Sequence, residues 1–141
     1  METHSAERIL NQINLYIAFV KGFKFKRMID ILKTAEVIEA CENLLQKRRP
    51  SEDIRHQVDL AYRIDNQSVL IYEIRSRWDK KDEFIESPIA KTTWVKSKNQ
   101  WKVFWMRADL KWHVYKPKAA VNTIYDFIKL VDQDPHGCFW G

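Results

Sequence analysis

Apolar residues near the start of the chain recur at helical spacing. One set falls near a single side of a helix that would break at Gly22: Ile9, Ile13, Ile17 and Val20. In residues 23–33, FKFK alternates like a strand, but the apolar positions that follow fit a helix, which we predict. A further helix is expected to begin with Thr34 as its N-cap and to end at Pro50, with an apolar stripe of Val37, Cys41, Leu44 and Leu45. Residues 1–50 are therefore predicted to be a helical N-terminal part.

From residue 57 the apolar positions alternate with a period of two, which is typical of strands. Two such runs flank a polar turn and predict a hairpin. Pairing Asp65 with Val69 across a three-residue loop places all apolar pairs on one face, whereas a slip of one residue mixes polar and apolar positions. The predicted pairs are Ile64 with Leu70, Tyr62 with Tyr72 and Leu60 with Ile74.

The rest of the chain completes a sheet and adds one helix. Residues 79–87 are expected to be a charged loop, followed by strands at about 89–96, 100–107 and 111–116. The strand at 100–107 is apolar on both faces, which indicates an interior position. Thr123 and Asp126 match a capping box that starts a last helix at 123–133, and the apolar chain end is expected to dock.

These elements predict one α+β domain over residues 1–141. Its sheet is a five-stranded antiparallel meander within residues 57–116, and the C-terminal helix packs on one face of the sheet. No internal repeat or linker divides the chain.

Composition agrees with a compact protein of the cell interior. The 141 residues are 45% hydrophobic and 30% charged, as in ordinary globular domains. Two cysteines are too few for a disulfide framework, so a reducing compartment, the cytoplasm, is expected. The sequence shows neither an apolar run long enough to cross a membrane nor a secretory signal at its start, so no membrane association is expected.

The net charge of +5 is concentrated in one segment. Residues 91–117 carry seven Lys or Arg against one Asp, together with four of the six tryptophans. A sheet that presents rings and cations together can stack bases and hold phosphates, which predicts a nucleic-acid interface. Its candidate residues are Lys91, Lys96, Lys102, Arg107, Lys111, Trp112, His113 and Tyr115. In the alternative, the rings are core and the lysines form a solvated face; a protein partner or a homodimer is the second expected kind of ligand.

A polar cluster on the hairpin suggests a different chemistry. The predicted register places Asp59 opposite Arg75 and Ala61 opposite Glu73. An acidic residue on one strand with Glu-x-Lys on the next is the arrangement of PD-(D/E)xK nucleases, in which carboxylates hold Mg²⁺. Here Arg75 would replace the lysine, and arginine does not readily give up a proton. A cross-strand ion pair between Asp59 and Arg75 is the simpler interpretation of the cluster.

Other enzyme chemistry has little support in the sequence. His136 and Cys138 do not have the spacing of a zinc motif, and Cys41 lies on an apolar helix stripe where a thiolate is not favoured. Gly-rich phosphate loops and GxSxG motifs are missing from the sequence. We therefore assign no catalytic residue, metal site or cofactor, and favour a non-enzymatic binding module.

The sheet region resembles a bacterial family catalogued as domain of unknown function 3024. The resemblance covers about residues 51–141 and rests on three pieces: Glu73-Ile74-Arg75 with Arg77-Trp78, then Trp101 with Trp105, then Lys111-Trp112-His113-Val114-Tyr115. It implies a small bacterial cytoplasmic protein and transfers no activity, cofactor or catalytic residue.

Overall fold

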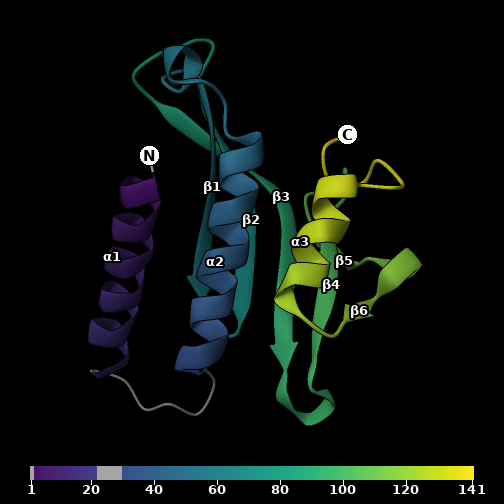
Figure 1. Ribbon diagram of the computed structural model, residues 1–141. Helices are drawn as coiled ribbons and strands as arrows, with labels where there is room; N and C mark the ends of the chain where they lie inside the picture. The colour runs from purple at the N-terminus through teal and green to yellow at the C-terminus, as the bar shows by residue number, and fades with distance from the viewer. Residues whose placement is uncertain (1, 22–29) are drawn as a thin grey trace.

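The computed structural model describes residues 2–21 and 30–141, and Figure 1 shows their arrangement. The described chain has three α-helices and a six-stranded antiparallel sheet, which confirms the predicted α+β class. The elements are α1 (Glu2–Lys21), α2 (Ile31–Arg48), β1 (Val58–Asp65), β2 (Ser68–Ser76), β3 (Phe84–Val95), β4 (Gln100–Met106), β5 (Trp112–Val114), β6 (Ala120–Val121) and α3 (Ile124–Gln133). Short 3₁₀ turns lie at Glu52–Ile54, Lys96–Lys98 and Lys116–Lys118.

Helix α2 begins earlier than predicted. Its N-cap is Asp30, whose carboxylate accepts a hydrogen bond from the Lys33 backbone N–H at 2.8 Å. Thr34 is buried inside the helix, and its hydroxyl donates to the Asp30 carbonyl. Asp and Thr are both favourable N-cap residues, and here Asp30 caps the helix in place of Thr34. Most of the helix predicted at 23–33 lies outside the described residues; residues 31–33 belong to α2.

The strands follow one another as a meander with the order β1-β2-β3-β4-β5, and β6 pairs with β4. The interior position predicted for β4 is confirmed. The charged loop predicted at 79–87 is shorter, because β3 already begins at Phe84 and pairs with the end of β2. The short strand β6 was not predicted, since two residues are too few to show an alternation.

The predicted hairpin register is wrong by one residue. Asp65 pairs with Ser68 across a two-residue loop, so Ile64 lies opposite Val69 and Tyr62 opposite Ile71. The short loop is made possible by Asn66, which adopts a left-handed φ of 53°. Strand β2 is apolar on both faces along most of its length, so polarity did not identify which face points to the core.

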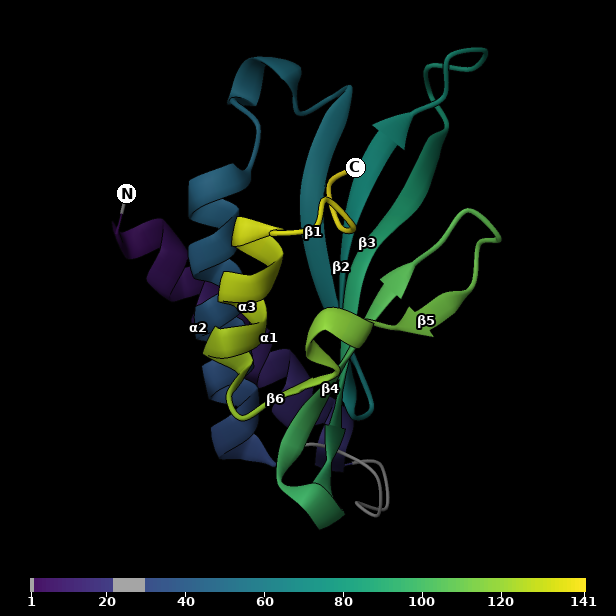
Figure 2. The same cartoon turned by 90° about the vertical axis from the view of Figure 1, so that its right-hand side faces the viewer.

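Helices α2 and α3 lie on one side of the sheet, as Figure 2 shows, and α1 packs beside α2 near the β1 edge (Figure 1). The core forms between α2, α3 and this covered face, with Val37, Val69, Val103, Ile124 and Phe127 all completely buried. The predicted capping box of α3 is present, with Thr123 and Asp126 exchanging hydrogen bonds. The chain end docks as expected: Phe139 is buried, and the Trp140 ring N–H donates to the Val131 carbonyl at 2.7 Å.

Candidate nucleic-acid interface

Cross-strand register divides the sheet into a covered face and an open face. Directly paired residues of neighbouring strands share a face. A covered row runs through Ile64, Val69, Thr92 and Val103, and the last three are completely buried. An adjacent row on the opposite face runs across five strands through Arg63, Leu70, Lys91, Phe104 and Val114. We call this second surface the open face, because no described helix covers it (Figure 2).

The open face places cations over aromatic rings on β3, β4 and β5. The Lys91 ammonium lies 5.1 Å from the Phe104 ring centroid and 5.7 Å from that of Trp112. Lys102, two residues before Phe104 on the same strand, lies 5.5 Å from the Phe104 ring. These distances are within the range of cation–π attraction. The ion pairs of the described residues include neither Lys91 nor Lys102, so their charges are not neutralised by a carboxylate.

The β1–β2 part of the open face differs in charge. Arg63 lies 4.9 Å from the Tyr72 ring centroid, so a ring and a cation meet here as well. The Arg63 guanidinium also binds the Glu86 carboxylate at 2.8 Å. This ion pair cancels the local charge. The free positive charge of the open face therefore lies on β3 and β4.

The remaining predicted cations lie at the ends of the strands, and Arg107 lies over Trp105, a ring of the other face. Lys96 is exposed in the turn after β3, and Lys111 is exposed in the loop before β5. Arg107 follows β4, with its guanidinium carbon 5.5 Å from the Trp105 ring centroid. These three residues lie at the ends of the strands and not beside the central rings.

His113 and Tyr115 point elsewhere. His113 pairs with Trp105 on the other face of the sheet from Trp112, and its Nε2 lies 2.7 Å from the Asp109 carboxylate. This hydrogen bond lowers the pKa of Asp109. Tyr115 is 0% exposed and packs on Phe139, with ring centroids 5.0 Å apart. Tyr115 therefore belongs to the core, and burial raises the pKa of its hydroxyl.

The tryptophans are divided between both predicted roles. Trp94 and Trp101 are core residues with ring centroids 5.3 Å apart. Trp112 is half-buried on the open face. Phe104, Tyr72 and Arg63 were not among the predicted site residues. Phe104 could have been predicted, because the alternation within 100–107 places it on the same face as Lys102.

The predicted polar cluster comes together only in part: Glu73 and Arg75 meet, and Asp59 lies apart from them. Asp59 lies opposite Ile74, and Glu73 opposite Leu60, so the two carboxylates belong to opposite faces of the sheet by register. The expected pair between Asp59 and Arg75 is therefore wrong.

The two carboxylates of that cluster have different arginine partners, and only Asp59 binds an arginine from outside the cluster. Arg49, the C-cap residue of α2, binds Asp59 through two hydrogen bonds of 2.8 and 2.9 Å, and these bonds lower the pKa of Asp59. Glu73 instead binds Arg75 on its own strand at 2.7 Å. The geometry thus offers no pair of carboxylates facing a shared space.

Neither thiol is activated. Burial strongly raises the pKa of Cys41, and burial followed by the nearby Asp134 carboxylate raises that of Cys138. Within residues 2–21 and 30–141, His, Cys, Asp and Glu side chains form no group of three that could hold a metal ion. The same part of the chain contains no helix with the length and apolarity needed to cross a membrane.

Comparison with known proteins yields one match. No curated protein and no solved structure matches the chain. A family model described as Domain of unknown function (DUF3024) matches residues 29–141, which contain α2, the entire sheet and α3. Helix α1 lies outside the matched residues. The resemblance seen in the sequence is thus confirmed and extends further toward the N-terminus, and the chain belongs to the family Domain of unknown function (DUF3024).

Proposed function

We propose that this protein binds single-stranded nucleic acid through the open face of its sheet. The observation that carries the proposal is the group formed by Lys91, Lys102, Phe104 and Trp112, in which two unpaired cations lie over two rings on three neighbouring strands. A base can stack on a ring, whatever its identity, while a flexible lysine moves to a phosphate. The surface therefore fits a single strand with little sequence preference.

The charge of this group favours nucleic acid over a protein partner. A protein-binding patch is expected to be apolar and depleted in charge at its centre. Here uncompensated lysines lie beside the rings, and further cations, Lys96 and Lys111, lie exposed at the ends of the strands. We place this activity in the cytoplasm, since both cysteines are free thiols.

A protein contact is the second candidate function, and it rests on a different region. Trp78, Phe84 and Ile85 lie at the end of the β2–β3 hairpin, and Trp78 is 93% exposed. Large apolar side chains gathered in this way favour association with another protein. This contact would not use the open-face lysines, so the two functions can be separated by substitution.

Fluorescence anisotropy with a labelled 12-nucleotide single-stranded RNA, titrated with the protein over a range of salt concentrations, tests the main proposal. We expect binding that weakens with salt. In the double variant Lys91→Gln/Lys102→Gln, loss of two phosphate contacts should weaken binding about tenfold at low salt and reduce the slope of log affinity against log salt by about 1.4. The matched control is Lys80→Gln/Lys129→Gln, which removes the same charge from the β2–β3 loop and from α3.

The control separates a built surface from general attraction to a basic protein. Binding in the control should stay within about twofold of the unmodified protein at matched salt, apart from a small effect of net charge. Equal losses in both double variants, or no binding at low salt, would contradict the proposal.

A further inference from the structure

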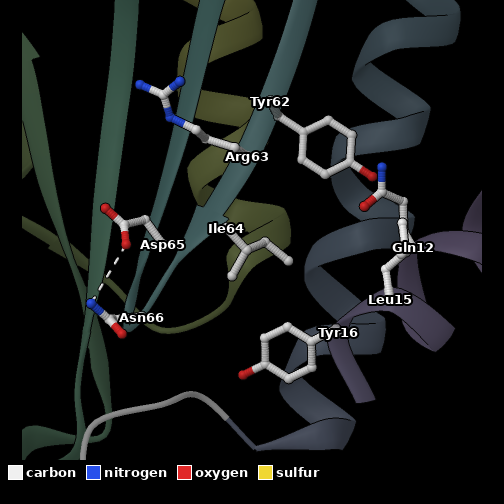
Figure 3. A pocket seen from close by; sticks show the side chains of 8 residues that line it. All are labelled: Gln12, Leu15, Tyr16, Tyr62, Arg63, Ile64, Asp65 and Asn66. Carbon is white, nitrogen blue, oxygen red and sulfur yellow. Dashed lines mark hydrogen bonds between the residues drawn. The ribbon is translucent and has the colours of Figure 1, made fainter. Parts of the chain in front are cut away.

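A cavity of about 330 Å³ lies between α1 and β1, on the opposite side of β1 from its partner strand β2 (Figure 3). Helix α1 contributes Gln12, Leu15 and Tyr16, and the other side is formed by Tyr62–Asp65 with Asn66 of the following turn. Consecutive residues of a strand point to alternate faces. Because four consecutive residues of β1 line one cavity, the cavity runs along the edge of the strand.

The backbone of β1 is unpaired along this edge. Among the strands of residues 30–141, β1 is at the edge of the sheet and pairs with β2 alone. The hydrogen bond from the Ser76 N–H to the Gln57 carbonyl sets the pattern of this antiparallel ladder, in which alternate residues face the partner strand. Residues 57, 59, 61, 63 and 65 therefore face β2, whereas Tyr62 and Ile64 direct their N–H and C=O groups outward toward the cavity. Within the described part of the chain, no hydrogen bond satisfies these outward groups.

At the next outward position, Leu60, the N–H already has a partner. The Leu60 N–H donates to the Asp59 carboxylate at 2.8 Å, and Arg49 holds this carboxylate in place. The part of the β1 edge in which both the N–H and the C=O groups of the outward residues are unpaired therefore extends from Tyr62 to the turn. Unpaired strand edges are the sites to which extended peptides add as a further strand.

The walls of the cavity are held in place by a buried polar contact. The Tyr62 hydroxyl donates to the Glu42 carboxylate at 3.0 Å, and Glu42, on α2, is only 3% exposed. Arg8 of α1 binds the same carboxylate at 3.2 Å. One acid therefore connects α1, α2 and β1, so the groove exists before any ligand arrives.

The groove has an apolar floor and an acidic end. Figure 3 shows the Tyr16, Tyr62 and Ile64 side chains around its centre. Asp65 lies at the turn end, where its side chain points to the other face of β1 from Ile64, toward Asn66 (Figure 3), and it takes part in no ion pair of the described residues. An added strand should therefore bring an apolar side chain for the floor and, at a neighbouring position that points to the opposite face, a cation for Asp65.

We propose that this groove binds an extended peptide segment of a partner protein, which adds to β1 as a seventh strand of the sheet. The peptide's backbone pairs with Tyr62 and Ile64, one apolar side chain enters the floor, and a Lys or Arg lies near Asp65. The site depends on α1, which lies outside the residues that the family model matches. It is separate from the open face and does not rest on the proposed nucleic-acid binding.

Selection from a phage-displayed library of random 12-residue peptides against the full chain tests this proposal. We expect enriched sequences that combine an aliphatic or aromatic residue with a nearby Lys or Arg. A labelled synthetic copy of an enriched peptide is then titrated with two variants of α1, Leu15→Lys at the cavity and Leu10→Lys outside it. Both leucines are more than half exposed, at 66% and 56%, so neither change should unfold the protein. We expect about tenfold weaker binding for Leu15→Lys, from lost apolar contact, and little change for Leu10→Lys.

Single N-methylation of the peptide tests the strand pairing itself. Methylation at alternate residues, whose N–H groups face β1, should each weaken binding about threefold to tenfold, whereas methylation at the residues between them should have little effect. No enrichment, equal loss in both leucine variants, or a methylation pattern without alternation would overturn the proposal. A dimer in solution that Leu15→Lys dissociates would overturn it too, because a second copy would then occupy the edge.

Discussion

Both faces of the sheet carry aromatic residues, but these residues are buried on the covered face and accessible on the open face. On the covered face, Trp94 and Trp101 lie against each other beneath the helices and are nearly inaccessible. On the open face, Phe104 and Trp112 remain half-buried, and Lys91 lies over both. Strand alternation alone produces both patterns. The helix layer decides which rings hold the fold together and which remain available to a ligand.

The largest effect is expected for the free energy of unfolding when a ring of the covered face is removed. Trp101 is 2% exposed, so Trp101→Ala leaves a cavity that should cost about 3 to 5 kcal/mol in free energy of unfolding. Trp112→Ala should cost about 1 kcal/mol, because the open face can relax into solvent. Urea unfolding followed by far-UV circular dichroism measures both. Equal costs would show that the open face is as much a core as the covered one.

The same open-face ring should matter for binding. Loss of one stacking ring in Trp112→Ala is expected to weaken binding of single-stranded RNA by about 1 to 3 kcal/mol. Trp78→Ala is the matched control, because Trp78 is highly exposed at the distant end of the β2–β3 hairpin. Anisotropy titrations compare the two. If both substitutions weaken RNA binding equally, exposed tryptophans contribute to binding wherever they lie, and the open face is not a specific site.

The helix layer above the covered face is held by a charge cluster that pH can release. Asp132 of α3 accepts hydrogen bonds from Arg48 and Lys47 of α2. These bonds, and the one from Arg48 most strongly, lower the pKa of Asp132 in the folded protein. A lowered folded pKa stabilises the protein above the unfolded value of about 3.9, and this stabilisation is lost as the pH falls through the folded pKa. Asp132→Asn should therefore cost about 1 to 2 kcal/mol at pH 7.

The cost of Asp132→Asn should shrink as the pH falls below about 4, where the carboxylate of the unfolded chain becomes protonated, and vanish once the pH has fallen through the lower pKa of the folded protein. Thermal unfolding of both proteins at pH 7 and pH 3 measures the difference. A cost that is the same at both pH values would mean that the charge of Asp132 does not contribute.

The smallest expected effect comes from the ion pair of the open face. Glu86 and Arg63 are each about half exposed, at 49% and 50% of their side-chain surface, so Glu86→Gln should change the free energy of unfolding by less than about 0.5 kcal/mol. The same substitution frees a cation beside Tyr72 and should strengthen RNA binding about twofold to fivefold at low salt. Unchanged binding would show that the β1–β2 part of the open face plays no role.

Features that depend on neighbouring residues could be predicted from the sequence. The capping box of α3 requires only Thr123 and Asp126, and its prediction is confirmed. The interior position of β4 followed from its apolar faces, which reflect neighbours on both sides of the sheet. In both cases, short-range pattern and tertiary structure agree.

The hairpin register could not be read from polarity. Leu70, Tyr72 and Ile74 form the more regular apolar set, but they face the open side, while Val69 and Ile71 face the core. Glu73 and Arg75 made the second set look polar. They can share the covered face with the core residues because they lie toward the end of β2, where their carboxylate and guanidinium bind each other and remain accessible.

The candidate site was predicted only in part. Lys91, Lys102 and Trp112 come together as the basic, aromatic segment suggested, whereas Tyr115 belongs to the core. Alternation places a residue on one of two faces but does not say which of them the helices cover. The groove at β1 was not predicted, because it is formed by residues about 50 positions apart in the sequence.

The central claim is that the open face, and not the covered face, binds single-stranded nucleic acid. It is tested most directly by NMR of ¹⁵N-labelled protein titrated with an unlabelled single-stranded RNA at low salt. The account predicts that amide signals shift around Lys91, Lys102–Phe104 and Trp112, while those of α2 and α3 stay in place. Shifts centred on the helices, or no shifts at all, would contradict it.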